Sequence, residues 1–302
     1  MISPALAPAD YILIIGCGDI GRRVAKLECA SGNAVIALAR SQSTVSRLTS
    51  LDVTAIMGDL DRPESLATLS AIRVSTLYYF APPPSHGCDD PRLPAALKAL
   101  NPVHPPTQIV YISTTGVYGD CSGAWIDETH AINPRTDRAQ RRVAAENRLR
   151  EWSDETGAAH VVLRVPGIYG PGRLPAERIR QGVPVVREAE SPWSNRIHSE
   201  DLAQACYVAA RRGTPGRIYN ISDGHPSTMT DYFFKVADQL GFPRPPEITL
   251  EQAKQSLGPG ILSFLEESRR IDNRRMREEL GIALQYPDLA RGLPACSEEQ
   301  AS

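Results

Sequence analysis

The sequence predicts an α/β fold built on a doubly wound parallel sheet, with a smaller, discontinuous C-terminal lobe. Short apolar runs typical of buried strands alternate with segments whose apolar residues have helical spacing. The first run leads into a glycine-rich turn and a helix, whereas 171–194 and 226–302 break the alternation with proline, glycine and polar helical segments. Strands that alternate with helices form right-handed parallel βαβ units, so the alternating part belongs to one sheet.

The expected strands share a composition of mostly apolar side chains, as strands covered on both faces do. In chain order they are Tyr11–Ile15, Ala34–Ala39, Val53–Met57, Thr76–Phe80, Ile109–Ser113, Val161–Val165 and Arg217–Ile221. A helix is expected over Asp19–Ala30, because Ile20, Val24 and Leu27 fall on one helical face.

A glycine-rich turn directly follows the first expected strand and opens the first helix. In Gly16-Cys17-Gly18-Asp19-Ile20-Gly21, the first glycine permits a tight turn, the second allows close approach of a pyrophosphate, and the third allows helix and strand to pack closely. The amides of Asp19 and Ile20 are expected to point at the phosphates, supported by the helix dipole. This context predicts a dinucleotide-binding site.

The motif identifies the expected sheet as a Rossmann-type fold. We assign 10–170 plus 196–225 to the dinucleotide-binding domain. We assign 171–195 plus 226–302 to a small substrate lobe.

The end of the second strand bears on the choice between NAD and NADP. Enzymes that use NAD usually carry an acid there that binds the ribose hydroxyls, whereas this chain has Arg40 and Ser41. A guanidinium and a hydroxyl suit a 2′-phosphate, so NADP is favoured. In the alternative, Arg40 stacks on adenine and the ligand is NAD.

Residues after the third and fourth strands are also cofactor candidates. Asp59 could accept a hydrogen bond from the adenine amino group, with Leu60 beside it, or could instead cap a helix before Pro63. Ala81 and Pro82 are expected to line the ribose side, although proline is equally ordinary loop chemistry.

Composition excludes several other classes of function. Net charge is −2, hydrophobic residues make up 42% and charged residues 23%, so nothing favours binding to nucleic acid or an anionic membrane. The six cysteines form no C-x-x-C pair and no metal-ligand spacing, so we expect a reduced, cytoplasmic setting and no metal. The apolar runs are too short to span a bilayer, and the first ten residues lack the basic region of a signal peptide.

Five segments together resemble the extended short-chain dehydrogenase/reductases, which include nucleotide-sugar epimerases and dehydratases. They come in the order of that family and are Gly16–Gly21, Gly58–Leu60, Ser113–Gly119, Arg164–Gly172 and Arg196–Ala203. The resemblance implies a nicotinamide cofactor and places Pro166 among the residues that bind it.

The family's chemistry rests on Ser or Thr, Tyr, and a Lys four residues after the Tyr. Thr114 matches the hydroxyl position and would hold the substrate oxygen. Alignment on Glu146 puts Arg138 at the place of the Tyr and Arg142 at the place of the Lys. Arg142 can still offer a cation to the ribose, but an arginine at position 138 is no ordinary acid or base, since guanidinium stays protonated. The sequence therefore resembles atypical members that lack the Tyr-x-x-x-Lys pair.

Three other side chains are candidates from the resemblance. Tyr118 is either a substitute acid, which would make it catalytic together with Thr114 and Arg142, or a wall of the substrate pocket. Arg173 and Arg196 would bind an anionic substrate, as arginines in such segments do in nucleotide-sugar enzymes; the alternative is arginines with no ligand.

The sequence thus predicts an NADP-dependent oxidoreductase, epimerase or dehydratase that acts on a small polar or nucleotide-sugar-like substrate. The alternative is a non-catalytic NADP-binding sensor or regulatory protein, because the fold alone does not establish catalysis. We expect a small-molecule partner and no nucleic acid or membrane. A homodimer is a further option, since family members often pair through two helices, of which 135–150 would be one.

Overall fold

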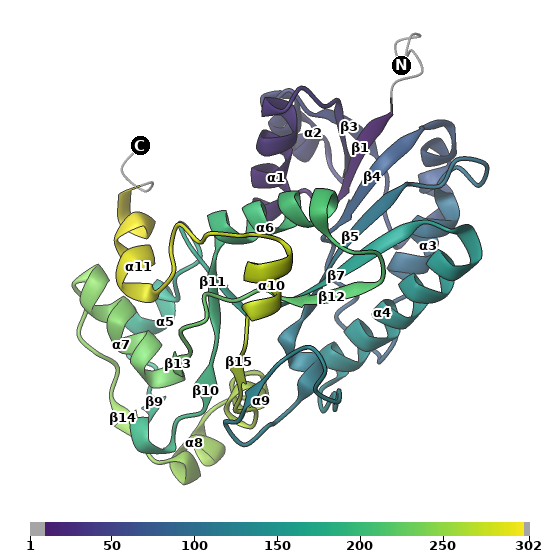
Figure 1. Ribbon diagram of the computed structural model, residues 1–302. Coiled ribbons are helices and arrows are strands. Elements are labelled where there is room, and N and C mark those ends of the chain that lie inside the picture. The colour runs from purple at the N-terminus through teal and green to yellow at the C-terminus, as the bar shows by residue number, and fades with distance from the viewer. Residues whose placement is uncertain (1–9, 299–302) are drawn as a thin grey trace. The chain divides into compact units, whose positions relative to one another are not determined.

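A seven-stranded sheet forms the centre of the computed structural model, which describes residues 10–298. Each pairing that links β3, β2, β1, β4 and β5 is parallel (Figure 1). The strand order is β12 (Arg217–Asn220), β7 (Ala159–Val165), β5 (Gln108–Thr114), β4 (Val74–Tyr79), β1 (Tyr11–Ile15), β2 (Val35–Ala39) and β3 (Thr54–Met57). Chain order reverses beside β1, where β2 lies on one side and β4 on the other. This is the switch point at which doubly wound sheets bind ligands.

Alternate side chains of the strands pack against helices on the two faces of the sheet. On one face, Leu13, Leu77 and Tyr111 form a core with helices η1 (Pro63–Ala71), α3 (Arg92–Ala99) and α4 (Asp137–Thr156). On the other face lie α1 (Asp19–Ala30) and α6 (Ser199–Arg212), whereas α2 (Gln42–Thr49) follows β2. The doubly wound α/β fold predicted from the sequence is confirmed.

The chain divides into two compact units. Among the described residues, unit 1 comprises 10–113, 140–163 and 203–218, and unit 2 comprises 114–139, 164–202 and 219–298. The chain passes from unit 1 into unit 2 near the carboxyl ends of β5, β7 and β12.

Short strand pairs and short helices make up unit 2. Its strand pairs are β8 (Gly167–Tyr169) with β11 (Arg196–His198), β9 (Val185–Val186) with β14 (Glu247–Ile248), β10 (Trp193–Ser194) with β13 (Ser227–Thr228), and β6 (Trp125–Ile126) with β15 (Arg270–Ile271). Its helices are η2 (Thr115–Tyr118), α5 (Ala176–Arg180), η3 (Glu188–Glu190), α7 (Met229–Leu240), α8 (Leu250–Ser256), α9 (Pro259–Leu265), α10 (Arg274–Glu279) and α11 (Leu289–Glu298). Tyr169, Val185, Phe233 and Leu293 belong to a separate apolar core, which packs α7 against α5 and α11.

The expected strands are all present, with ends that differ by one or two residues at most, and helix Asp19–Ala30 is as predicted. The unit boundaries differ from the expected domain boundaries, because 114–139, 164–170, 196–202 and 219–225 group with the C-terminal segment. Pairing of β6 with β15 is one physical reason, since it ties residues 125–126 to residues 270–271. The assignment of one part to cofactor and the other to substrate stays a prediction.

No helix among residues 10–298 is both long enough and apolar enough to cross a membrane.

Candidate functional site

The glycine turn of unit 1 has the geometry of a phosphate cradle. Gly16 has a φ of +91°, and a Cβ there would lie 2.3 Å from the backbone nitrogen of Ala81, so only glycine fits. A Cβ on Gly21 would lie 2.9 Å from the carbonyl oxygen of Gly16, so this position also requires a close approach.

Gly18 differs from the other two glycines, because a Cβ there would meet nothing within 4 Å. It is the N-cap of α1 and has no side chain that could cap the helix. At this position, no side chain therefore covers the positive end of the dipole of this twelve-residue helix. A nicotinamide dinucleotide fits this cradle, since its pyrophosphate needs backbone amides, a helix N-terminus and room beside the second glycine.

One guanidinium and several hydroxyls follow β2. Arg40 is exposed, and Ser41 is the N-cap of α2, where its hydroxyl accepts a hydrogen bond from the Thr44 amide at 3.3 Å. The same hydroxyl lies 3.0 Å from Ser43 Oγ and 3.0 Å from Thr44 Oγ1. Hydrogen bonding to Arg92 and the nearby charge of Arg40 hold the pKa of the Asp61 carboxyl below its ordinary value. Within unit 1, the positive charge of Arg40 therefore acts on the carboxylate of Asp61, and the hydroxyls of Ser41, Ser43 and Thr44 follow Arg40 directly in the chain.

Asp59 shapes the loop after β3. Its Oδ1 accepts a hydrogen bond from the Asp61 amide at 3.1 Å, and its own amide donates to Ser65 Oγ at 2.8 Å. The alternative of a helix cap is wrong for Asp59, because the N-cap of η1 is Arg62. Leu60 packs against the core of the sheet. Contact of Asp59 with adenine stays a prediction.

The loop after β4 lies against the glycine turn. The Ala81 amide donates to the carbonyl of Ile15 at 3.1 Å, which holds Ala81 beside Gly16. Arg92 then links this loop to the previous one: it donates to the Pro82 carbonyl at 2.9 Å and binds both Asp61 oxygens at 2.7 and 2.6 Å. No local sequence motif marks an arginine that bridges two loops, so Arg92 becomes visible only in the tertiary structure.

Arg142 lies on α4 at the carboxyl end of β5. Its Nη1 donates to the carbonyl of Ile112 at 3.0 Å and to the hydroxyl of Tyr111 at 3.2 Å. Asp90 is fully buried nearby, and burial raises the pKa of its carboxyl, while the charge of Arg142 is one of the influences that lower it. Arg142 therefore supplies a fixed cation in unit 1.

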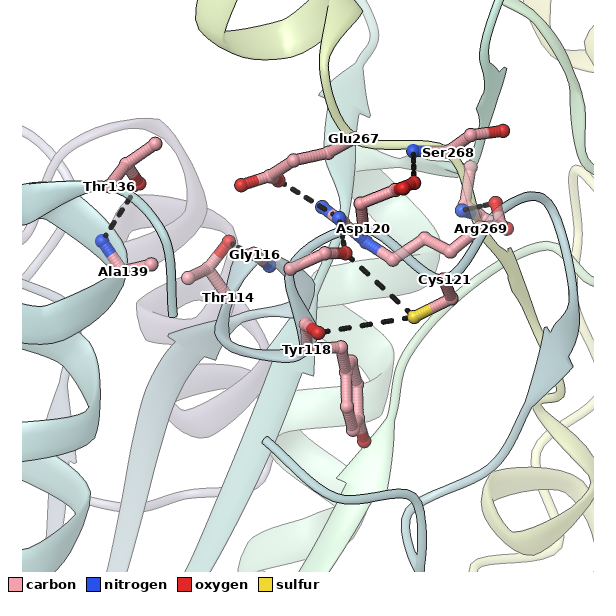
Figure 2. Close-up of polar contacts among 12 residues, drawn as sticks. Thr114, Gly116, Tyr118, Asp120, Cys121, Thr136, Ala139, Glu267, Ser268 and Arg269 are labelled. Atoms are coloured by element: carbon pink, nitrogen blue, oxygen red, sulfur yellow. Dashed lines mark hydrogen bonds and ion pairs between the residues drawn. The ribbon is translucent and has the colours of Figure 1, made fainter. Parts of the chain in front are cut away.

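Thr114 begins the part of unit 2 shown in Figure 2. It is the N-cap of η2, and its Oγ1 accepts a hydrogen bond from the Gly116 amide at 3.1 Å. This contact uses a lone pair of the oxygen and leaves the hydroxyl proton available for a substrate oxygen.

Tyr118 is buried, with 1% of its surface exposed, and its hydroxyl donates to Asn220 Oδ1 at 2.8 Å. The guanidinium of Arg164 lies 4.9 Å from its ring centroid. Burial raises the pKa of this phenol, and Figure 2 shows the ring pointing away from Thr114. A catalytic role for Tyr118 stays a prediction, and this placement gives its hydroxyl a structural partner.

The remaining predicted residues of unit 2 lie in different surroundings. Arg138 lies 3.9 Å from the ring centroid of Phe264. Arg196 lies 4.2 Å from the ring centroid of Tyr232 and donates to the Asn195 carbonyl at 2.8 Å. Arg173 is exposed in the loop after β8, and Pro166 directly follows β7. Their predicted contacts with substrate or cofactor stay predictions. Among residues 10–298, no group of His, Cys, Asp or Glu has the arrangement of a metal site.

Comparison with known proteins places this arrangement in a family. The model of the "NAD dependent epimerase/dehydratase family" matches residues 12–222. The protein YeeZ of Escherichia coli K12 is 33% identical over 183 residues, which cover 60% of this chain and 59% of YeeZ. Human dTDP-D-glucose 4,6-dehydratase is 25% identical over 122 residues, which cover 38% of this chain and 35% of that enzyme. The chain thus matches about three fifths of the length of YeeZ, and about a third of that of the dehydratase.

Solved structures agree with the sequence comparisons. A conserved protein of unknown function from Silicibacter pomeroyi is 30% identical, with a TM-score of 0.81 over 97% of this chain and 100% of that one. UDP-glucose 4-epimerase of Thermotoga maritima, solved with UDP-glucose, is 19% identical, with a TM-score of 0.79 over 97% and 100% of the two chains, and shows the fold alone. The sheet, the glycine turn and the family match over most of the chain lead to one conclusion: the protein belongs to the NAD-dependent epimerase/dehydratase family.

Proposed function

We propose that this chain binds NADP and acts as an epimerase, dehydratase or oxidoreductase on a hydroxyl-bearing carbon of a small polar or nucleotide-sugar-like substrate. The observation that carries the proposal is the cradle of Gly16, Gly18 and Gly21, open at Gly18 and followed by Arg40 at the end of the next strand. Relatives whose names include sugar-nucleotide enzymes support the substrate class.

The residues that would hold the cofactor come mainly from the carboxyl ends of β1 to β5. The backbone of the glycine turn, including Asp19 and Ile20, would bind the pyrophosphate. Arg40 and Ser41 would bind the 2′-phosphate, and the carboxylate of Asp59 would accept from the adenine amino group. Further contacts would come from Leu60, Ala81, Pro82, Arg142 and Pro166.

The chemistry divides between the cofactor and the protein. When bound, a nicotinamide dinucleotide accepts a hydride from a substrate carbon or returns it. Thr114 would hold the substrate oxygen through its hydroxyl proton, and Arg142 would hold the ribose hydroxyls as a fixed cation. Arg173 and Arg196 are the proposed anchors for an anionic substrate.

Cofactor titration and a substrate panel test this function. NADPH and NADH are titrated by fluorescence to compare the two cofactors. For turnover, the protein is loaded with the oxidised cofactor, which can accept a hydride, and incubated with UDP-glucose, UDP-N-acetylglucosamine and dTDP-glucose while NMR detects an epimer or a keto product. We expect tighter binding of NADPH than of NADH, and turnover of at least one sugar that Thr114→Ala lowers by about 10²-fold or more. Tight NADPH binding with no turnover of the panel would contradict the enzymatic proposal and favour a sensor.

A further inference from the structure

The segment that follows α9 lies beside the loop after β5, within unit 2. The Ser268 amide donates to Asp120 Oδ1 at 2.9 Å, and the Ser268 carbonyl accepts from the amides of Cys121 at 3.0 Å and Gly123 at 2.9 Å (Figure 2). Arg269 Nη1 donates to the Gly119 carbonyl at 2.6 Å. Because Gly119 is the C-cap of η2, these bonds fix residues 267–269 relative to the helical turn that Thr114 caps.

Glu267 carries a buried carboxylate of which one oxygen has a partner and the other, among the described residues, has none. Its side chain is buried, with 5% of its surface exposed. Oε2 lies 2.9 Å from Arg269 Nη1, whereas Oε1 has no hydrogen-bond partner in the described part of the chain. A buried acceptor without a partner is costly, and such an atom is commonly retained where a ligand supplies the missing donor.

The unused oxygen faces the candidate catalytic hydroxyl. Figure 2 shows the Glu267 carboxylate reaching from the α9 segment toward Thr114 and Gly116, with the oxygen bound to Arg269 turned the other way. Phe264 of α9 lies over Arg138, the residue aligned with the family's missing Tyr, at 3.9 Å from guanidinium carbon to ring centroid. The ring of Phe264 therefore covers Arg138, and the carboxylate that points toward Thr114 belongs to Glu267, three residues further along the same segment.

Other ionisable groups near Glu267 are poorer proton acceptors. Burial raises the pKa of the Cys121 thiol, and the charges of Asp120 and Glu267 add to this effect against the opposing charge of Arg269, so the thiol stays protonated. Asp120 Oδ1 already accepts from the amides of Ser122 and Ser268. Arg138 and Arg269 are guanidinium groups that give up no proton near neutral pH.

We propose that Glu267 is the proton acceptor of this enzyme, in place of the missing tyrosine, a role that rests on the proposed function. The hydroxyl of Thr114 donates to the substrate oxygen, and the O–H bond of that substrate hydroxyl breaks as its proton moves to Glu267 Oε1. The O–H electron pair forms the new C=O bond, while the C–H electron pair leaves with its hydrogen as hydride to the oxidised nicotinamide. In the reverse direction Glu267 returns the proton to the oxygen.

The test compares Glu267→Gln with Glu266→Gln. Glutamine keeps the shape of the side chain but accepts no proton, and Glu266 is the adjacent exposed residue, so its variant is the matched control. Each protein is titrated with NADPH by fluorescence, and the sugar on which the wild type is most active is assayed from pH 5 to 9. We expect Glu267→Gln to lower kcat by about 10²- to 10⁴-fold and to lose the fall in rate on the acid side, with the NADPH Kd changed less than twofold. Glu266→Gln should match the wild type in every readout.

Each contrary outcome has its own meaning. If Glu267→Gln keeps kcat and the acid-side fall in rate, Glu267 is not the proton acceptor, and the proposed function stands. If kcat falls but the pH profile keeps the wild-type shape, or NADPH binding weakens to the same extent, the residue acts only through structure and the proposal is overturned. If the wild type turns over none of the panel, the proposed function fails and takes this role with it.

Discussion

Individual glycines decide how the cofactor turn is built, and they do so for different reasons. Gly16 is required by backbone geometry, because its φ of +91° and the 2.3 Å approach to Ala81 leave no room for a side chain. Gly18 has a negative φ and open space where a Cβ would lie, so folding does not require a glycine at this position. Glycine at position 16 is therefore needed for folding, whereas glycine at position 18 is needed for the proposed binding of the pyrophosphate.

We therefore expect Gly16→Ala and Gly18→Ala to fail differently. Gly16→Ala should lower the free energy of unfolding by about 2 kcal/mol or more, since it adds backbone strain and a clash. Gly18→Ala should keep its Tm within a few degrees but weaken NADPH binding, because the methyl group fills the space proposed for the pyrophosphate. Thermal unfolding and fluorescence titration measure both effects. Equal loss of stability in the two variants would contradict this interpretation.

The proposed preference for NADP depends on one exposed guanidinium. Arg40→Ala should weaken NADPH binding about 10- to 100-fold, the usual effect of losing a charge-assisted hydrogen bond, and leave NADH binding nearly unchanged. Arg47→Ala, which removes an exposed arginine from α2, is the matched control and should change neither. An unchanged ratio of the two affinities in Arg40→Ala would show that the site does not select the 2′-phosphate through this residue.

At the scale of elements, a buried charge ties two helices to the sheet of unit 1. Glu28 of α1 accepts from Tyr78 of β4 at 2.5 Å, from Arg211 of α6 at 2.9 and 2.7 Å, and from Asn33 at 2.6 Å. Burial raises the pKa of this carboxyl, but the hydrogen bonds and charge of its partners outweigh burial and leave the pKa below its ordinary value of 4.5. The network thus stabilises the packing of α1 and α6 when Glu28 is ionised.

Glu28→Gln should lower the free energy of unfolding by about 2 kcal/mol at pH 7, less than for a fully buried pair because Arg211 is one-third exposed. Because the folded pKa is depressed, this stability is present above about pH 4.5 and is lost as the pH falls through the folded value. Urea unfolding at several pH values measures it. Glu151→Gln removes an exposed ion pair with Arg148 and should cost less than about 0.5 kcal/mol; a similar loss in both variants would contradict the argument.

At the scale of the whole molecule, each unit has its own apolar core and its own buried charges. In unit 2, the Asp201 carboxylate accepts from the amides of Gln285 at 2.7 Å and Tyr286 at 2.9 Å, which fastens the C-terminal segment to the start of α6. Asp223 is buried after β12, with its Oδ1 bound to the His225 amide and no partner for Oδ2 in the described residues. Burial raises the pKa of Asp223 to about 7.

Stability should consequently fall as the pH rises from about 4 to about 7 and level off above pH 7. The folded protein holds the Asp223 proton between about pH 4 and pH 7, whereas the unfolded chain does not, so stability is greatest below this range. Asp223→Asn should remove this dependence and stabilise the protein by about 2 kcal/mol at pH 8, with little effect near pH 4. Thermal unfolding from pH 4 to 8 measures the change. A wild-type Tm that is flat across this range would contradict the raised pKa.

The sequence alone was sufficient for the sheet, the glycine turn and the family, because these depend on local patterns. Apolar runs mark buried strands, and the glycine turn is marked by the spacing of Gly16, Gly18 and Gly21 between the first strand and the first helix. By contrast, the partners of Tyr118 and Arg142 come from distant parts of the chain, as does the Arg211 partner of Glu28. Only the tertiary structure shows that the Tyr118 hydroxyl donates to Asn220 and that the Glu267 carboxylate points toward Thr114. The physical reason is that hydrogen-bond partners and burial are set by packing and not by spacing along the sequence.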